Sequence, residues 1–124
     1  MSFTVDQLVI FAARAGNLPL LKERVQAGGN INYVDSKHGS ALAEAIRQSN
    51  LDLLDWLISN GADVNIQYRD GIGPLEVALR DPVSAVVYRL VYAGAKLRKT
   101  TRPYYRTRLE QCLTEVASAG KKEQ

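Results

Sequence analysis

The chain has 124 residues, enough for one modest domain, and 46% of them are hydrophobic, an ordinary fraction for a globular protein. A net charge of +3 is too small to indicate nucleic-acid binding by itself, and a single cysteine excludes an internal disulfide framework. The apolar run at 8–13 follows Asp6 and ends at Arg14, so it suits neither a signal peptide nor a membrane span. We therefore expect a soluble, cytoplasmic chain.

A glycine turn recurs every 33 residues along the chain. Its glycines are Gly28, Gly61 and Gly94, and the surrounding segments read QAGGNIN, SNGADVN and YAGAKLR. Apolar positions agree on the same offset, for example Val9, Leu42 and Leu75, and again Val25, Ile58 and Val91. A period of this length is typical of a solenoid of stacked repeats.

Each unit is predicted to hold two short helices. In the central unit Leu42, Ala45 and Ile46 form the apolar stripe of one helix around 40–48, and a larger stripe marks a second helix around 51–59. The small residues on the first stripe would let a neighbouring helix approach closely.

Caps and turns follow the same period. Asn17 and Asn50 are predicted to cap the second helices, and Asp81-Pro82 should do so in the third unit. The recurring glycines should end those helices at positive φ. The polar segments at 33–39 and 66–73 are then expected to form extended turns or short hairpins.

Residues 99–120 break the period. Pro103 can start a helix, and its expected apolar stripe is Tyr105, Leu109, Cys112, Leu113 and Val116. Such a helix would cover the open hydrophobic end of the third unit, because terminal repeats of a solenoid need a cap.

The central segment GSALAEAIRQSNLDLLDWLISNGADVN closely resembles an ankyrin repeat, and DGIGPLEVALRDPVSAVVYRLVYAGAKL resembles a second. LVIFAARAGNLPLLKERVQAGGNIN looks like a first repeat without its leading turn. The resemblance implies an all-α solenoid in one domain, residues 1–120, with repeats at about 4–34, 35–67 and 68–99, a capping helix at about 103–119 and a loose tail at 121–124. The family's Thr-Pro-Leu-His motif is replaced, so the histidine that helps to tie down its hairpins is missing.

No catalytic constellation is present in the sequence, and the resemblance also implies a non-catalytic protein. His38 lies in a predicted turn, more than two repeats from Cys112, so we expect no nucleophile pair. Glu44 and Glu76 occupy equivalent helix positions, and we expect surface carboxylates that pair with the arginines at 47 and 80. We expect no metal, no cofactor and no small-molecule substrate.

Arg14, Arg47 and Arg80 also obey the 33-residue offset. In proteins that this chain resembles, the position lies on the concave side, where partners commonly bind. Stacked repeats would set the three side chains ~10 Å apart, about the spacing of packed helices. Such a row suits the carboxylates of an acidic protein surface. The alternative is that the arginines solvate the face or pair with Glu44 and Glu76.

Turn residues and a second basic segment add further candidates. Tyr33 and Tyr68 lie in or beside the turns, and both an anchor role and hairpin packing are open. Residues 96–108 contain no acid and form a partner site or a solubilising surface. Tyr88 and Tyr92 are expected to cover the join with the final helix, and an exposed patch is the alternative. The predicted partner contacts are Arg14, Arg47, Arg80, Tyr33, Lys37, His38, Tyr68, Arg69, Ile72, Arg98 and Arg102.

These features predict a protein-binding module, monomeric when free, that masks a partner protein as a stoichiometric inhibitor or adaptor. A bacterial immunity or antitoxin protein is one version of this function, and a regulator of a eukaryotic kinase or transcription factor is another. Nucleic-acid binding through residues 96–108 is the alternative. It is less favoured because aspartates interrupt the rest of the surface and no recognition motif occurs.

Overall fold

The computed structural model describes residues 2–35, 39–68, 71–98 and 102–122, with side chains up to residue 115 in the last range. Within these ranges the chain forms helices and turns but no strand, apart from one isolated bridge between Asp35 and Gly39. The helices are α1 (Val5–Arg14), α2 (Leu18–Gln26), α3 (Ala41–Gln48), α4 (Leu51–Ser59), α5 (Pro74–Arg80), α6 (Ser84–Tyr92) and α7 (Pro103–Lys122).

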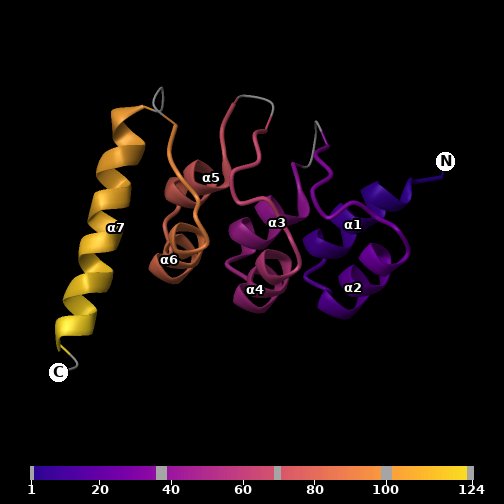
Figure 1. The fold of residues 1–124 in the computed structure, drawn as a ribbon, viewed down its shortest axis with the longest axis horizontal. Coiled ribbons are helices and arrows are strands. Elements are labelled where there is room, and N and C mark those ends of the chain that lie inside the picture. The colour runs from indigo at the N-terminus through magenta and orange to yellow at the C-terminus, as the bar shows by residue number, and fades with distance from the viewer. Residues whose placement is uncertain (1, 36–38, 69–70, 99–101, 123–124) are drawn as a thin grey trace.

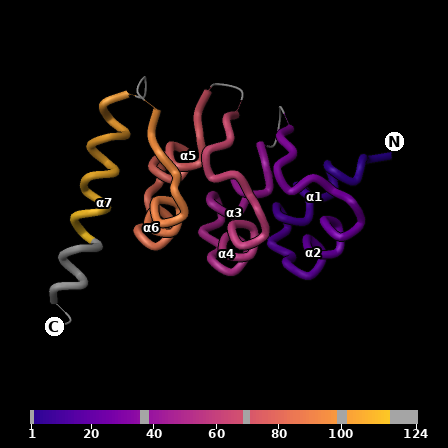
Figure 2. The backbone as a smooth tube through the Cα atoms, in the orientation of Figure 1, coloured from indigo at the N-terminus to yellow at the C-terminus, as the bar shows by residue number. Residues whose placement is uncertain are grey.

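The first six helices form three pairs that lie side by side in one row (Figure 1). Helices α1, α3 and α5 make one layer, in which α3 contacts both neighbours, and α4 contacts α6 in the other layer. Figure 2 follows the backbone from α1 at one end of the row to α7 at the other. The structure confirms the predicted all-α solenoid.

Side-chain caps explain where most of the paired helices begin. The Asn17 carboxamide oxygen accepts the N–H of Leu20 at 3.1 Å, and Asn50 caps Leu53 in the same way at 3.2 Å, as predicted. The prediction for Asp81 is wrong, because α6 begins at Ser84 and its N-cap is Val83, which has no capping side chain. Asp81 instead ends α5.

The recurring glycines end the second helix of each pair, as the sequence predicted. Gly28, Gly61 and Gly94 have φ of +102°, +95° and +100°, a region that side-chain-bearing residues rarely adopt. A Cβ atom at these three positions would meet no neighbour within 4 Å, so the backbone angle alone accounts for glycine there.

The core runs continuously through all three helix pairs. Alanines on the first helices, such as Ala13, Ala45 and Ala78, are buried where those helices pack together. Larger side chains fill the space between the layers; fully buried examples are Leu21, Leu53, Leu54, Leu57, Val86, Val87 and Leu90. Trp56 packs against this core but stays half-buried.

Two asparagines join successive repeats through hydrogen bonds to the backbone. Asn32 accepts the N–H of Asp63 at 2.7 Å and donates to the carbonyl of Gly61 at 3.1 Å. Asn65 repeats this arrangement one unit later, with Lys96 at 2.9 Å and Gly94 at 3.0 Å. Each carboxamide therefore fixes the glycine turn of the following repeat.

Helix α7 packs against α6 and α5 at the end of the row. Cys112 is buried, and Tyr105 and Leu109 are half-buried against the core. Burial raises the pKa of the Cys112 thiol, with the charge of Glu115 adding to the effect. Leu113 is 37% exposed, so its predicted place in the buried stripe is wrong; the adjacent Cys112 takes the position that faces the core. Among the described residues, no helix has both the length and the apolar character needed to cross a bilayer. The domain boundaries given above stay a prediction.

Candidate protein-binding surface

Three arginines occupy corresponding places in the first helix of each pair. Arg14, Arg47 and Arg80 lie in the last turns of α1, α3 and α5, and all three are exposed. A cation in the last turn of a helix is favoured by the helix dipole, which gives each arginine a local structural reason as well. Because the three helices form one layer, their last turns follow one another along the row.

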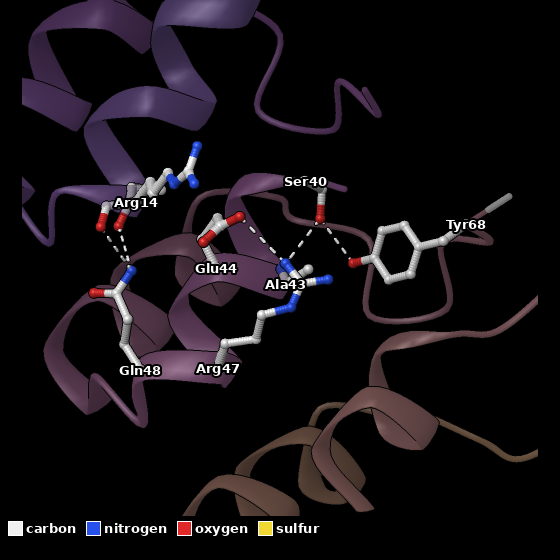
Figure 3. Close-up of polar contacts among 8 residues, drawn as sticks. Arg14, Ser40, Ala43, Glu44, Arg47, Gln48 and Tyr68 are labelled. Atoms are coloured by element: carbon white, nitrogen blue, oxygen red, sulfur yellow. Dashed lines mark hydrogen bonds and ion pairs between the residues drawn. The ribbon is translucent and has the colours of Figure 1, made fainter. Parts of the chain in front are cut away.

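The Gln48 side chain sets the spacing of the first two arginines. Its carboxamide nitrogen donates to the carbonyl oxygens of Ala13 and Arg14, at 2.9 and 3.1 Å (Figure 3). Carbonyl groups in the last turn of a helix have no partner within that helix, so α3 completes the hydrogen bonding of α1. This pair of hydrogen bonds, which we call the Gln48 clasp, holds the C-terminal ends of the two helices together.

An ion pair orients the second arginine. The Arg47 guanidinium donates from Nη1 to the Glu44 carboxylate at 3.2 Å, one helical turn earlier. The Arg47 side chain stays 48% exposed, whereas the Glu44 side chain is only 11% exposed. In the view of Figure 3 the Arg14 and Arg47 side chains both extend toward the upper right.

The glutamates differ from the expectation of surface carboxylates. Glu44 and Glu76 are 8% and 4% exposed. Of the two expected pairs with arginine, Glu44 with Arg47 is confirmed. Glu76 accepts the N–H of Gly73 at 3.3 Å and so helps to cap α5, a role that the spacing to Arg80 did not predict.

A groove connects the second and third arginines. Arg47 and Arg80 both line it, together with Asp81, and its apolar wall includes Ile46, Val77 and the 41% exposed Val83. Asp81 stands 33 residues after Gln48 and, when ionised, has no hydrogen to donate to a carbonyl. The clasp between α1 and α3 therefore has no equivalent from this position between α3 and α5.

The predicted turn contacts lie partly inside the fold. The Tyr68 hydroxyl lies 2.7 Å from Ser40 Oγ, and burial raises the Tyr68 pKa to about 12. Ile72 also packs against the core, and its carbonyl accepts the N–H of Tyr68 at 2.9 Å. This geometry favours hairpin packing over partner contact for these two residues. Tyr33 is half-buried. The predicted contacts Lys37, His38 and Arg69, and Lys99 of the basic segment, lie outside the described residues.

The basic segment forms a separate cluster at the C-terminal end of the row. Arg106 donates to the Arg98 carbonyl at 2.8 Å, and the Arg98 guanidinium lies against Gly71, where any side chain would meet it. Arg102 is exposed, and Arg108 lies over the Tyr104 ring, 5.0 Å from its centroid. The predicted contacts Arg98 and Arg102 therefore belong with α7 and not with the first-helix arginines.

The prediction for Tyr88 and Tyr92 is wrong. The two rings stack with centroids 6.1 Å apart, but they are 47% and 83% exposed. They line a groove with Asp55 and Ile58 of α4, so they face the preceding pair and not the join with α7. An ion pair of 2.8 Å between Arg89 and Asp55 borders this groove.

The repeat pattern did not indicate that Gln48 or Val83 belongs to this surface. The carbonyl partners of Gln48 lie 34 and 35 residues earlier, and nothing in the local sequence marks them. Asn32 and Asn65 were more accessible to prediction, because they share the 33-residue offset of the glycines they contact.

Comparison with known proteins agrees with this geometry. A family model described as ankyrin repeat matches residues 37–66. The chain is 40% identical over 74 residues to potassium channel AKT1 of Arabidopsis thaliana, which covers 60% of the chain and 9% of the channel. It is 37% identical over 102 residues to the mouse ankyrin repeat and SAM domain-containing protein 6, covering 79% of the chain and 12% of that protein. It is 30% identical over 105 residues to the mouse RelA-associated inhibitor, covering 85% of the chain and 13% of that protein.

The stacked helix pairs, the recurring glycine turns and these matches identify the chain as an ankyrin repeat protein. Ankyrin repeats are modules that bind other proteins, and the family is not enzymatic. The chain spans 9% to 13% of the length of the three relatives named above.

Proposed function

We propose that this ankyrin repeat chain masks an acidic surface of a partner protein, as a stoichiometric inhibitor or adaptor. The observation that carries the proposal is the recurrence of an exposed arginine in the last turn of α1, α3 and α5. A partner that lies along this layer would meet one guanidinium from each repeat.

The chemistry of arginine supports an acidic partner. A guanidinium can donate two parallel hydrogen bonds to one carboxylate, and such bidentate pairs are stronger and more directional than contacts of lysine. The Glu44 carboxylate orients Arg47, which lowers the conformational entropy that this side chain would lose on binding. The Gln48 clasp fixes the position of α3 against α1, and therefore also the relative position of Arg47 and Arg14.

Masking, in contrast to catalysis, suits a chain whose described residues are almost entirely repeat scaffold. One relative is named an inhibitor, the RelA-associated inhibitor, and this lends support to an inhibitory role. The immunity-protein version remains one form of the proposal, in which the masked partner is a toxic enzyme. The proposal takes the free chain to be a monomer, which sedimentation can check.

Paired charge reversals test the proposal. The tagged chain is cross-linked to its partner in the host cell, and the captured proteins are quantified for wild type, for Arg47→Glu/Arg80→Glu and for Lys22→Glu/Arg24→Glu. Both double variants change the charge by the same amount, but the second lies on α2. We expect a specific protein to be lost with the first variant and kept with the second, and its cross-linked surface to be acidic.

An equal loss of captured partner with both variants would mean that overall charge governs binding, and not the arginine row formed by Arg14, Arg47 and Arg80. Capture of the same proteins by wild type and by Arg47→Glu/Arg80→Glu would contradict the proposed surface outright.

A further inference from the structure

A third groove lies at the C-terminal end of the row, between α7 and the segment that follows α6. Its floor is apolar and is formed by Leu75, Val91, Ala95, Leu97 and Leu109. Lys96 and Arg106 stand on its rim, with Glu110. Leu75 and Ala95 are buried, whereas Lys96, Arg106 and Glu110 are exposed. The groove therefore combines a surface that can bury an aliphatic group with charged groups around its opening.

The surroundings of this groove are strongly cationic. Residues 96–109 contain no acid, and the described cations of this stretch are Lys96, Arg98, Arg102, Arg106 and Arg108. The hydrogen bond from Arg106 to the Arg98 carbonyl, 2.8 Å long, joins the basic segment after α6 to the first turns of α7. Glu110 is the one acid among the lining residues named above, so positive charge dominates the opening.

We propose that this groove binds an acidic protein segment in which carboxylates flank a large aliphatic side chain. The aliphatic side chain would lie on the floor between Val91 and Leu109, and its removal from water would favour binding. The flanking carboxylates would pair with Lys96 and the neighbouring arginines, which supplies selectivity and faster association. The groove lies apart from the arginine row of α1, α3 and α5, so this second contact goes beyond the proposed function.

The local geometry favours an acidic protein segment over single-stranded nucleic acid. Nucleic-acid strands bind such basic surfaces by stacking bases on exposed aromatic rings. Tyr104 is the exposed ring of this cluster, but the Arg108 guanidinium already covers one face at 5.0 Å. Tyr105 meets Tyr104 edge to face at 5.3 Å. The apolar floor, in turn, matches an aliphatic side chain and offers nothing to a phosphate backbone.

Three probes and two variants of the full chain test this inference by fluorescence anisotropy at fixed salt. The probes are labelled peptides Glu-Glu-Leu-Glu-Glu and Glu-Glu-Ser-Glu-Glu, which have equal charge, and a ten-nucleotide oligothymidine. The variants are Lys96→Glu/Arg102→Glu and, as a matched control, Lys22→Glu/Arg24→Glu. Arg102 is chosen because it is exposed and lies before α7, whereas Arg106 takes part in the fold.

We expect the leucine peptide to bind ~10-fold more tightly than the serine peptide, as burial of one aliphatic side chain predicts. Lys96→Glu/Arg102→Glu should weaken the leucine peptide ~10-fold, whereas the α2 control should change it less than ~2-fold. Amide shifts in the NMR spectrum should move at Ala95–Leu97 and at Leu109.

Several results would overturn the inference. These are no detectable binding of the leucine peptide, equal binding of the two peptides, equal effects of the two variants, and tighter binding of oligothymidine than of either peptide. Because none of these substitutions touches Arg14, Arg47 or Arg80, such a result would leave the proposed function standing.

Discussion

The Tyr68 hydroxyl and the Ser40 hydroxyl lie 2.7 Å apart, although 28 residues separate them in the chain. Ser40 is the N-cap of α3, and its Oγ also accepts the N–H of Ala43 at 3.2 Å. The contact therefore ties the turn before α5 to the beginning of the helix in the preceding repeat (Figure 3). The sequence left the rigidity of these turns open, because the family's histidine is missing. In this chain the hydrogen bond between Tyr68 and Ser40 holds the turn in place.

Tyr68→Phe should make the stability of the chain less dependent on pH in the alkaline range. Burial raises the Tyr68 pKa from 10.0 to about 12. Between these values the unfolded chain loses the proton while the native chain keeps it, so the free energy of unfolding falls as pH rises. Near neutral pH, loss of the hydroxyl should cost ~1 kcal/mol. Urea titrations should show that the difference in free energy of unfolding between wild type and Tyr68→Phe becomes smaller above about pH 10. A stability difference that stays constant up to about pH 11 would contradict the raised pKa of Tyr68.

Asn32→Ala and Asn65→Ala should each destabilise the fold by ~1–3 kcal/mol, because each removes two hydrogen bonds to the next repeat. Asn60→Ala is the matched control, since the Asn60 carboxamide donates to Trp56 within its own helix turn. Urea denaturation followed by circular dichroism measures all three. Losses for Asn32 and Asn65 no larger than the loss for Asn60 would show that the links between repeats add little stability.

Ser49→Gly should stabilise the chain by ~0.5–1 kcal/mol, because Ser49 has a φ of +51°, where a Cβ atom is unfavourable. The first repeat has Gly16 at the equivalent position, with a φ of +68°. Ser59→Gly, at the end of α4, is the control and should destabilise by a similar amount. Thermal melts of the two variants should move in opposite directions. A fall in the melting temperature of Ser49→Gly would show that the Ser49 side chain makes a compensating contact.

Gln48→Glu should destabilise the chain by ~1–3 kcal/mol, because it replaces the two donated hydrogen bonds with a carboxylate facing the carbonyls of Ala13 and Arg14. Gln26→Glu, an exposed change at the end of α2, makes the same chemical substitution without such partners. The denaturant midpoint of unfolding is measured for Gln48→Glu and for Gln26→Glu. Equal midpoints would mean that the Gln48 clasp is not needed to hold α1 against α3.

The repeated features of the fold were predictable because each of them has a local cause. Asn17 and Asn50 cap helices through bonds to residues three positions ahead, and Gly61 ends a helix through its own backbone angle. The third unit departs from the pattern at Asp81, which ends α5, while α6 begins at Ser84 after the N-cap Val83. The capping pattern that holds at Asn17 and Asn50 therefore does not extend to the third unit, where α6 has no side-chain cap.

The candidate site was less predictable, because it depends on contacts between units. The positions of Arg14, Arg47 and Arg80 followed from the period, but the clasp from Gln48 and the groove beside Val83 arise only when helices are side by side. The surroundings of Tyr88 and Tyr92 were also not predictable from the sequence, because they too depend on how the helices pack. Their helical spacing indicated a shared face, but which neighbour that face meets depends on how α6 is rotated against α4 and α7.

The binding of the cross-linked partner to Arg14→Glu/Arg47→Glu/Arg80→Glu, measured by calorimetry, tests the arginine row most directly. We predict an affinity at least ~100-fold weaker than that of wild type, as expected when several charge pairs are reversed, and recovery when acidic residues of the partner surface are changed to lysine. An affinity equal to that of wild type would contradict the claim that this row of guanidinium groups binds the partner.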